Sequence, residues 1–153
     1  MPRNRPLLVV AAAALALAGC APVVNLPAAE DAADPGCASV VVSLPEELGA
    51  ESLPEPLERR DTSSQGSAAY GDPASVTLRC GMPEPAPSTE RCITVGEVDW
   101  LLLGQEDDVW TLVSYGRSPA TEVIIDTKVT SSSSALEAIS PAVARTELVR
   151  SCE

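Results

Sequence analysis

Histidine is absent from the 153 residues of the chain, and its absence excludes several kinds of active site. Without imidazole there is no Ser–His–Asp triad and no Cys–His pair. Most catalytic zinc sites lose their usual ligand, and the usual proton shuttle near neutral pH is missing. Catalysis by carboxylates, Tyr, Ser or Cys stays open. We nevertheless expect no enzymatic activity, no cofactor and no metal site.

Aromatic residues and basic residues are also scarce. Phe is absent and aromatic residues make up 3% of the chain, so the core must be aliphatic, with Trp100 and Trp110 as its largest side chains. The chain has 10 Lys and Arg against 22 Asp and Glu, which gives a net charge of −12. A field of that sign repels nucleic acid and anionic lipid headgroups. We therefore expect no nucleic-acid partner.

The N-terminal stretch is typical of a secretory signal. A basic start is followed by an apolar run over residues 7–17, which is shorter than the roughly 20 residues that a membrane span needs. Residues 17–20, Leu-Ala-Gly-Cys, resemble the bacterial lipobox, in whose precursors the cysteine thiol receives a diacylglycerol. Cleavage then falls between Gly19 and Cys20. Ordinary cleavage that releases a free soluble protein is the alternative.

These features divide the chain into three parts. Residues 1–19 are expected to be a lipoprotein signal peptide. Residues 20–36 begin with the lipidated Cys20, and their prolines and acids predict a flexible tether. Residues 37–153 are expected to form a single domain. The membrane is then a partner through the lipid, and the expected location is the extracytoplasmic face of the cell membrane.

Hydrophobic periodicity predicts an α+β domain. Residues 37–44 have apolar positions at helical spacing, although three consecutive valines also fit a strand. Alternating or apolar runs predict antiparallel strands near residues 75–80, 92–95, 98–103, 109–115 and 121–129. Ser134 and Glu137 fit a helical capping box, and Pro141 fits the start of another helix. We expect a sheet of four or five strands with N- and C-terminal helices on one face, held by two disulfides.

Four cysteines remain once Cys20 is assigned to lipid. An even number in an exported chain points to disulfides, and four cysteines allow three pairings that sequence alone does not decide. We favour Cys80–Cys92, which closes a short loop, and Cys37–Cys152, which ties the ends of the domain together. Structural zinc and a thioredoxin-like redox site both need closer cysteine spacing than the chain provides.

The order of several motifs resembles a family of small exported envelope proteins from actinobacteria, the domain of unknown function family 3515. The resemblance covers Cys37 to Cys152. It implies an exported, membrane-associated protein and carries no known activity. The shared features are Cys37 before Leu44-Pro45, Arg59-Arg60, the turn Tyr70–Pro73, the R-C-G-x-P-x-P stretch from Arg79, Val98-Asp99-Trp100, the turn Tyr115–Pro119, and Ser140–Ala144.

Four arginines are candidates for ligand binding on this acidic chain: Arg59, Arg60, Arg79 and Arg117. Together they could form a small basic pocket for a carboxylate or phosphate. For Arg117 the alternative is a purely structural turn. Trp100 and Trp110 could stack on a sugar, although core packing is the more common role. Residues 106–108 lack the ligand number and spacing of a calcium loop.

Two functional hypotheses follow. The first is a binding or interaction module of the cell envelope, with another envelope protein or a wall precursor as its partner. The alternative is an envelope enzyme or thiol-redox accessory that uses arginines and carboxylates, or the Cys80/Cys92 pair.

The lipobox generates the first test. Replacing Cys20 with Ala removes the thiol that would carry the lipid, so the protein should leave the membrane fraction and lose incorporation of labelled palmitate. Fractionation of cells that express either form measures this. A variant that still sediments with membranes and still incorporates palmitate would show the assignment to be wrong.

Overall fold

The computed structural model describes residues 22–152, so the predicted signal peptide and Cys20 lie outside the described residues. Within that part of the chain, neither helix has the length and apolar character of a membrane-spanning segment. The elements, in chain order, are α1 (Pro35–Ser43), β1 (Glu47–Leu48), β2 (Leu57–Arg60), β3 (Ser67–Tyr70), β4 (Val76–Met82), β5 (Cys92–Val95), β6 (Val98–Glu106), β7 (Val109–Tyr115), β8 (Arg117–Ser118), β9 (Ala120–Asp126), α2 (Ser132–Val143) and β10 (Glu147–Leu148).

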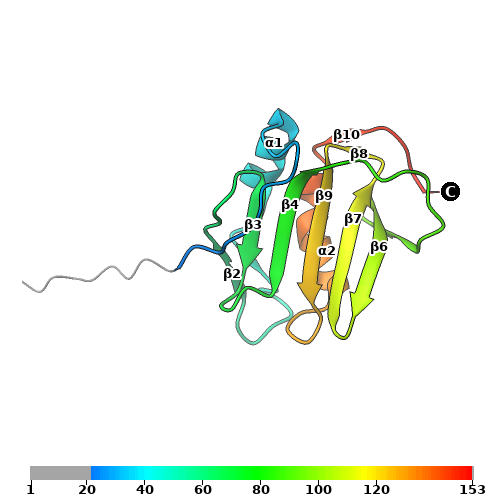
Figure 1. The fold of residues 1–153 in the computed structure, drawn as a ribbon. Coiled ribbons are helices and arrows are strands. Elements are labelled where there is room, and N and C mark those ends of the chain that lie inside the picture. Colours follow the sequence, from blue (N-terminus) through cyan, green and yellow to red (C-terminus); the bar gives the residue numbers. More distant parts are fainter. Residues whose placement is uncertain (1–21, 153) are drawn as a thin grey trace, which may run out of the picture.

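The architecture is mostly β, and the predicted fold class is wrong. Eight strands form one antiparallel sheet in the order β1-β2-β3-β4-β9-β7-β6-β5, and β8 pairs with β10 in a small separate ribbon. The expected four or five strands correspond to β4, β5, β6, β7 and β9. Strands β1, β2 and β3 were missed because each has two to four residues, too few for a readable alternation. The two helices are short, and α2 lies behind the sheet (Figure 1).

The alternation predicted for the central strands is confirmed, and it explains the core. Val76, Leu78 and Cys80 on β4 are fully buried, as are Val123 and Ile125 on β9. They pack with the buried faces of α1 and α2 in one cluster. Burying aliphatic side chains of this size stabilises a fold by about 1.5–3 kcal/mol each. The core is therefore aliphatic, with the fully buried Trp100 as its largest member.

Both helices begin at residues other than those predicted from the sequence. The predicted helix near Cys37 is confirmed, and it starts at Pro35 because the Asp34 carboxylate accepts a hydrogen bond from the Gly36 amide at 2.6 Å. At α2 the cap is Ser131, not the predicted Ser134. Pro141 lies inside α2 and does not start a new helix. The helix continues past it because Ala142 and Val143 are buried in the core.

The four cysteines form two disulfides, as expected, but the favoured pairing is wrong. The bonds are Cys37–Cys80 and Cys92–Cys152. Strands β4 and β5, which carry Cys80 and Cys92, are separated in the sheet by β9, β7 and β6. With strands about 4.8 Å apart, the two cysteines lie far beyond the Cα separation that a disulfide spans. Chain proximity therefore misled the prediction, because the strand order in space differs from the order in sequence.

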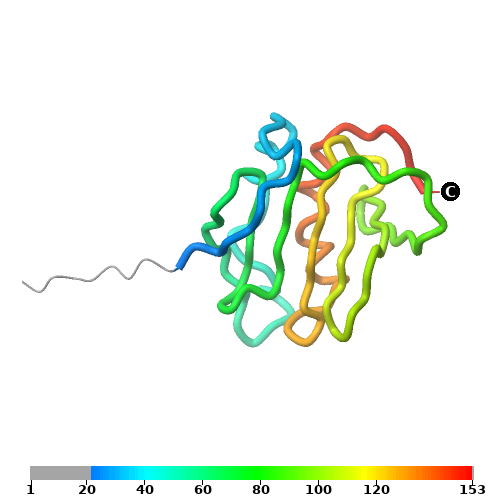
Figure 2. Tube along the Cα trace, viewed as in Figure 1, coloured from blue at the N-terminus to red at the C-terminus, as the bar shows by residue number. Residues whose placement is uncertain are grey.

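Residues 22–34, named here the N-terminal strap, pack against the sheet. Figures 1 and 2 show the strap crossing in front of the sheet, opposite α2, to reach α1. Val24 forms a parallel bridge with Thr62, and the Asp31 amide donates to the Gly81 carbonyl at 3.0 Å. Ala32 is 6% exposed. The structure therefore differs from the expected flexible tether, because most of that segment is bonded to the domain.

Two glycines allow the backbone of the strap to lie directly against the backbone of the sheet. A Cβ atom at Gly81 would overlap the backbone of Asp31 and Ala32, and Gly81 has φ +100°, a conformation that L side chains rarely adopt. A Cβ at Gly66 would lie 2.9 Å from the Ala32 carbonyl oxygen. Absence of a side chain at these positions is thus a condition for strap docking.

The glycine contacts generate the second test. Gly81→Ala should destabilise the fold and release the strap, because the new methyl group occupies the space of the strap backbone. Gly96→Ala is the matched control. Gly96 also has positive φ but has open space around it, so its substitution should cost only the backbone strain of about 1–2 kcal/mol.

Chemical denaturation and Glu-C proteolysis after Glu30 measure both effects. We expect a larger loss of stability and rapid cleavage only in Gly81→Ala. Equal losses in the two variants, with the strap still resistant, would contradict this contact.

Candidate functional site

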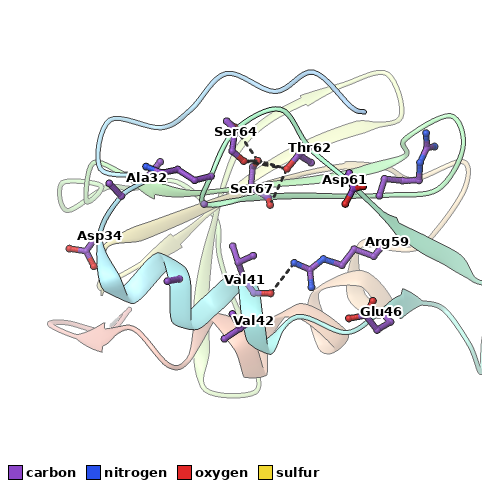
Figure 3. Close-up of a pocket in the computed structure, with 15 residues that line it drawn as sticks. Ala32, Asp34, Val41, Val42, Glu46, Arg59, Asp61, Thr62, Ser64 and Ser67 are labelled. Carbon is purple, nitrogen blue, oxygen red and sulfur yellow. Dashed lines mark hydrogen bonds between the residues drawn. The ribbon is translucent and has the colours of Figure 1, made fainter. Parts of the chain in front are cut away.

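The candidate site is a pocket of about 610 Å³ between α1, the end of the strap, and the segment that joins β2 to β3 (Figure 3). One wall is apolar and comes from the outward face of α1, with Ala38, Val41 and Val42. This face is free because α1 buries Cys37 and Val40 on its other side. Val42 is 81% exposed. The helix thus offers an apolar surface to whatever enters the pocket.

The opposite wall carries the arginine on which the site depends. Arg59 lies on β2, is half-buried, and donates one hydrogen bond from Nη2 to the Val41 carbonyl oxygen at 2.9 Å. Across residues 22–152, no carboxylate lies within ion-pair distance of its guanidinium. Glu46 and Asp61 line the same pocket and are exposed. The site therefore combines one unpaired cation with two carboxylates nearby.

Tyr70 lies opposite Arg59 on the neighbouring strand β3. It is the register partner of Arg59 across β2 and β3, it is fully buried, and its hydroxyl donates to the Pro45 carbonyl oxygen at 2.9 Å. Burial raises the pKa of Tyr70 to about 12, while Arg59 lowers it and Glu46 raises it. Tyr70 therefore stays neutral at physiological pH.

Three hydroxyls form a compact cluster at the upper side of the pocket in Figure 3. The Ser67 hydroxyl lies 2.8 Å from Thr62 Oγ1 and 3.0 Å from Ser64 Oγ. This cluster is not among the sites that the sequence predicts. The only signal in the sequence is that Thr62 and the serines are close together along the chain. That signal is weak, because polar segments of this composition are common in loops.

The four predicted ligand-binding arginines do not converge, and only Arg59 and Arg60 line the pocket. Arg60 is engaged elsewhere. Its Nη1 lies 3.1 Å from the Asp72 carboxylate and donates to the Gly71 carbonyl, and its Nη2 donates to the Pro22 carbonyl oxygen at 2.8 Å. Arg60 therefore holds the start of the strap, and Arg59 is left as the binding group.

Arg79 and Arg117 have structural roles. Arg79 pairs with Glu122 on the neighbouring strand β9 at 2.7 Å. Arg117 is buried and donates to the carbonyl oxygens of Glu97, Ala144 and Thr146. The guanidinium of Arg117 thus ties the turn after β7 to the end of α2, which supports the structural alternative for that residue.

The other candidates from the sequence are also explained by structure. Trp100 is buried and donates to the Ser140 hydroxyl at 3.1 Å, so it belongs to the core and offers no sugar platform. Trp110 is partly buried against the same core. In the acidic turn, Asp108 pairs with Lys128 at 2.9 Å.

Asp99 lies beside the Cys92–Cys152 disulfide, and it is the one place in residues 22–152 where metal-ligating atoms cluster. Both sulfurs are bonded to each other. The Asp99 carboxylate accepts from the Cys152 amide at 2.8 Å and from Thr94 Oγ1 at 2.7 Å. This group therefore locks the C-terminal tail in place. A redox pair of Cys80 with Cys92 is wrong, since the two belong to different disulfides.

The family comparison agrees with the motif order. A family model described as "protein of unknown function (DUF3515)" matches residues 6–151. The chain belongs to the DUF3515 family. The match begins before Cys37, so this DUF3515 domain includes the strap as well as the pocket. No curated protein and no solved structure matches the chain.

The contrast between Arg59 and Arg117 generates the third test. Arg117→Ala removes three hydrogen bonds to backbone carbonyl groups, one of them buried and two partly buried, and should cost about 3 kcal/mol in the free energy of unfolding. Arg59→Ala removes one partly exposed bond and should cost about 1 kcal/mol. Chemical denaturation compares the two. Equal costs would contradict the assignment of Arg59 as a group that is free to bind.

Proposed function

We propose that this DUF3515 protein is an exported, lipid-anchored binding module of the cell envelope whose ligand site is the Arg59 pocket. The signal-like N-terminus and the lipobox-like residues ending at Cys20 support export and anchoring at the extracytoplasmic face of the membrane. The ligand is a small group, or part of a larger envelope molecule, that carries a carboxylate or phosphate. Another envelope protein or a wall precursor could present such a group.

The observation that carries the proposal is the state of the Arg59 guanidinium. It has five N–H donors in a planar fork, and one hydrogen bond to the Val41 carbonyl engages it within the described residues. Such a fork matches the oxygens of a carboxylate or phosphate in bidentate fashion. The guanidinium groups of Arg60, Arg79 and Arg117 each make at least two bonds to carboxylate or carbonyl oxygens.

The chemistry of the pocket favours binding over catalysis. Nucleophilic or acid–base catalysis needs a nucleophile within hydrogen-bond reach of a base. The hydroxyls of Thr62, Ser64 and Ser67 contact one another, and the Tyr70 hydroxyl is bonded to a backbone carbonyl. A pocket with an apolar wall and a few polar groups is instead typical of a binding site.

The guanidinium generates the fourth test. Inorganic phosphate and acetate, titrated into the isotope-labelled full chain and followed by NMR, should shift backbone amides of α1 and residues 59–67. Arg59→Ala should abolish these shifts, since the oxygens lose their donor.

Arg145→Ala is the control variant, because Arg145 is exposed and its substitution changes the net charge by the same amount. Shifts that persist in Arg59→Ala, or that cluster outside the pocket, would contradict the site.

A further inference from the structure

We infer that the Arg59 pocket takes the zwitterionic headgroup of an aminophospholipid, that is, a phosphate joined to a primary ammonium, in the membrane that holds the anchor. This inference rests on the proposed function and on the lipid at Cys20. Three observations carry it: the short chain between anchor and pocket, the mixed charge of the lining, and the lack of aromatic side chains there.

The strap places the pocket next to the membrane. Arg60 lines the pocket and donates to the carbonyl oxygen of Pro22, which is two residues after Cys20 in the sequence. Two residues span at most about 7 Å of extended chain. Val24 is then bonded to Asp61 and Ser63. A domain held this closely cannot move far from the bilayer, and its pocket lies within reach of lipid headgroups.

The charges of the pocket select a ligand that carries both signs. Arg59 offers donors to an anion, while Glu46 and Asp61 would repel a ligand that is only anionic. The net charge of −12 repels anionic lipids in the same way. A headgroup without net charge escapes this repulsion. Its phosphate can bind Arg59, and its ammonium can face the carboxylates of Glu46 and Asp61.

The lining further favours a primary ammonium over a quaternary one. Quaternary ammonium groups are recognised by aromatic cages. The pocket, as formed by the described residues, is lined by no aromatic side chain. It offers hydrogen-bond acceptors instead, namely the carboxylates of Glu46 and Asp61 and the hydroxyls of Thr62 and Ser64, which suit the three N–H donors of an ammonium.

The apolar wall gives the rest of the lipid a surface. Val41 and Val42 on α1 are among the residues that line the pocket, and Val42 is largely exposed. The glycerol and the first methylenes of an acyl chain can pack there while the headgroup binds across the pocket.

The test uses soluble short-chain lipids and the full chain carrying Cys20→Ala, followed by NMR. Dihexanoyl phosphatidylethanolamine, below its micellar concentration, should bind at the pocket at least about tenfold more tightly than the choline and glycerol analogues. Arg59→Ala should remove this binding, and Arg145→Ala should leave it unchanged. The double variant Glu46→Gln and Asp61→Asn should lose the preference for ethanolamine but keep the shifts caused by phosphate.

Titrations with further ligands distinguish a failure of this inference from a failure of the proposed function. Free phosphoethanolamine that binds as tightly as the lipid would show that the ligand is a soluble zwitterion and would overturn a lipid ligand. Equal binding of the three lipids would overturn headgroup selection. In both cases Arg59-dependent shifts with inorganic phosphate would leave the proposed function standing. The absence of pocket shifts with every probe would overturn both.

Discussion

The close approach of the N-terminal strap to the glycines of the sheet is the constraint on which the rest of the structure depends. Asp31 and Ala32 lie directly over Gly81, where any side chain would occupy their space. Docking there brings Asp34 to the position where it caps α1. Helix α1 is in turn bonded to β4 through Cys37–Cys80. This one contact therefore couples the strap, helix α1 and the pocket wall that α1 forms.

This coupling gives the two disulfides different roles. Cys37–Cys80 is completely buried and fixes α1, and with it the apolar side of the pocket. Cys92–Cys152 is partly exposed and fastens the C-terminal tail, with Asp99 bonded to the tail amide. Each closes a loop of more than 40 residues, a length at which the chain-entropy model gives about 4 kcal/mol per bond. Such bonds agree with the export that we propose, because disulfides persist in oxidising compartments.

The sequence predicted the parts of the fold that depend on local patterns. Alternation identified β4 and β9, and helical spacing identified α1, because both patterns reflect burial of nearby residues. Local patterns could not predict the disulfide pairing or the docking of the strap, because both depend on which strands become neighbours in the sheet. Pro22 to Asp34 has the composition of a linker, and nothing in it shows that Gly81 will leave room for it. The site was only partly predicted: Arg59 and Arg60 were candidates, but the hydroxyl cluster of Thr62, Ser64 and Ser67 was not predicted.

The central claim is that the strap is docked in the folded protein, and amide hydrogen exchange at Val24, Asp31 and Ser63 tests it most directly. These three amides donate to carbonyl oxygens of Asp61, Gly81 and Val24. We expect all three to exchange far more slowly than the unstructured chain, with protection lost together when the strap is released. Exchange at the rate of an unstructured chain, in a domain whose β4 and β9 amides remain protected, would contradict the docked strap and the position that we propose for the pocket near the membrane.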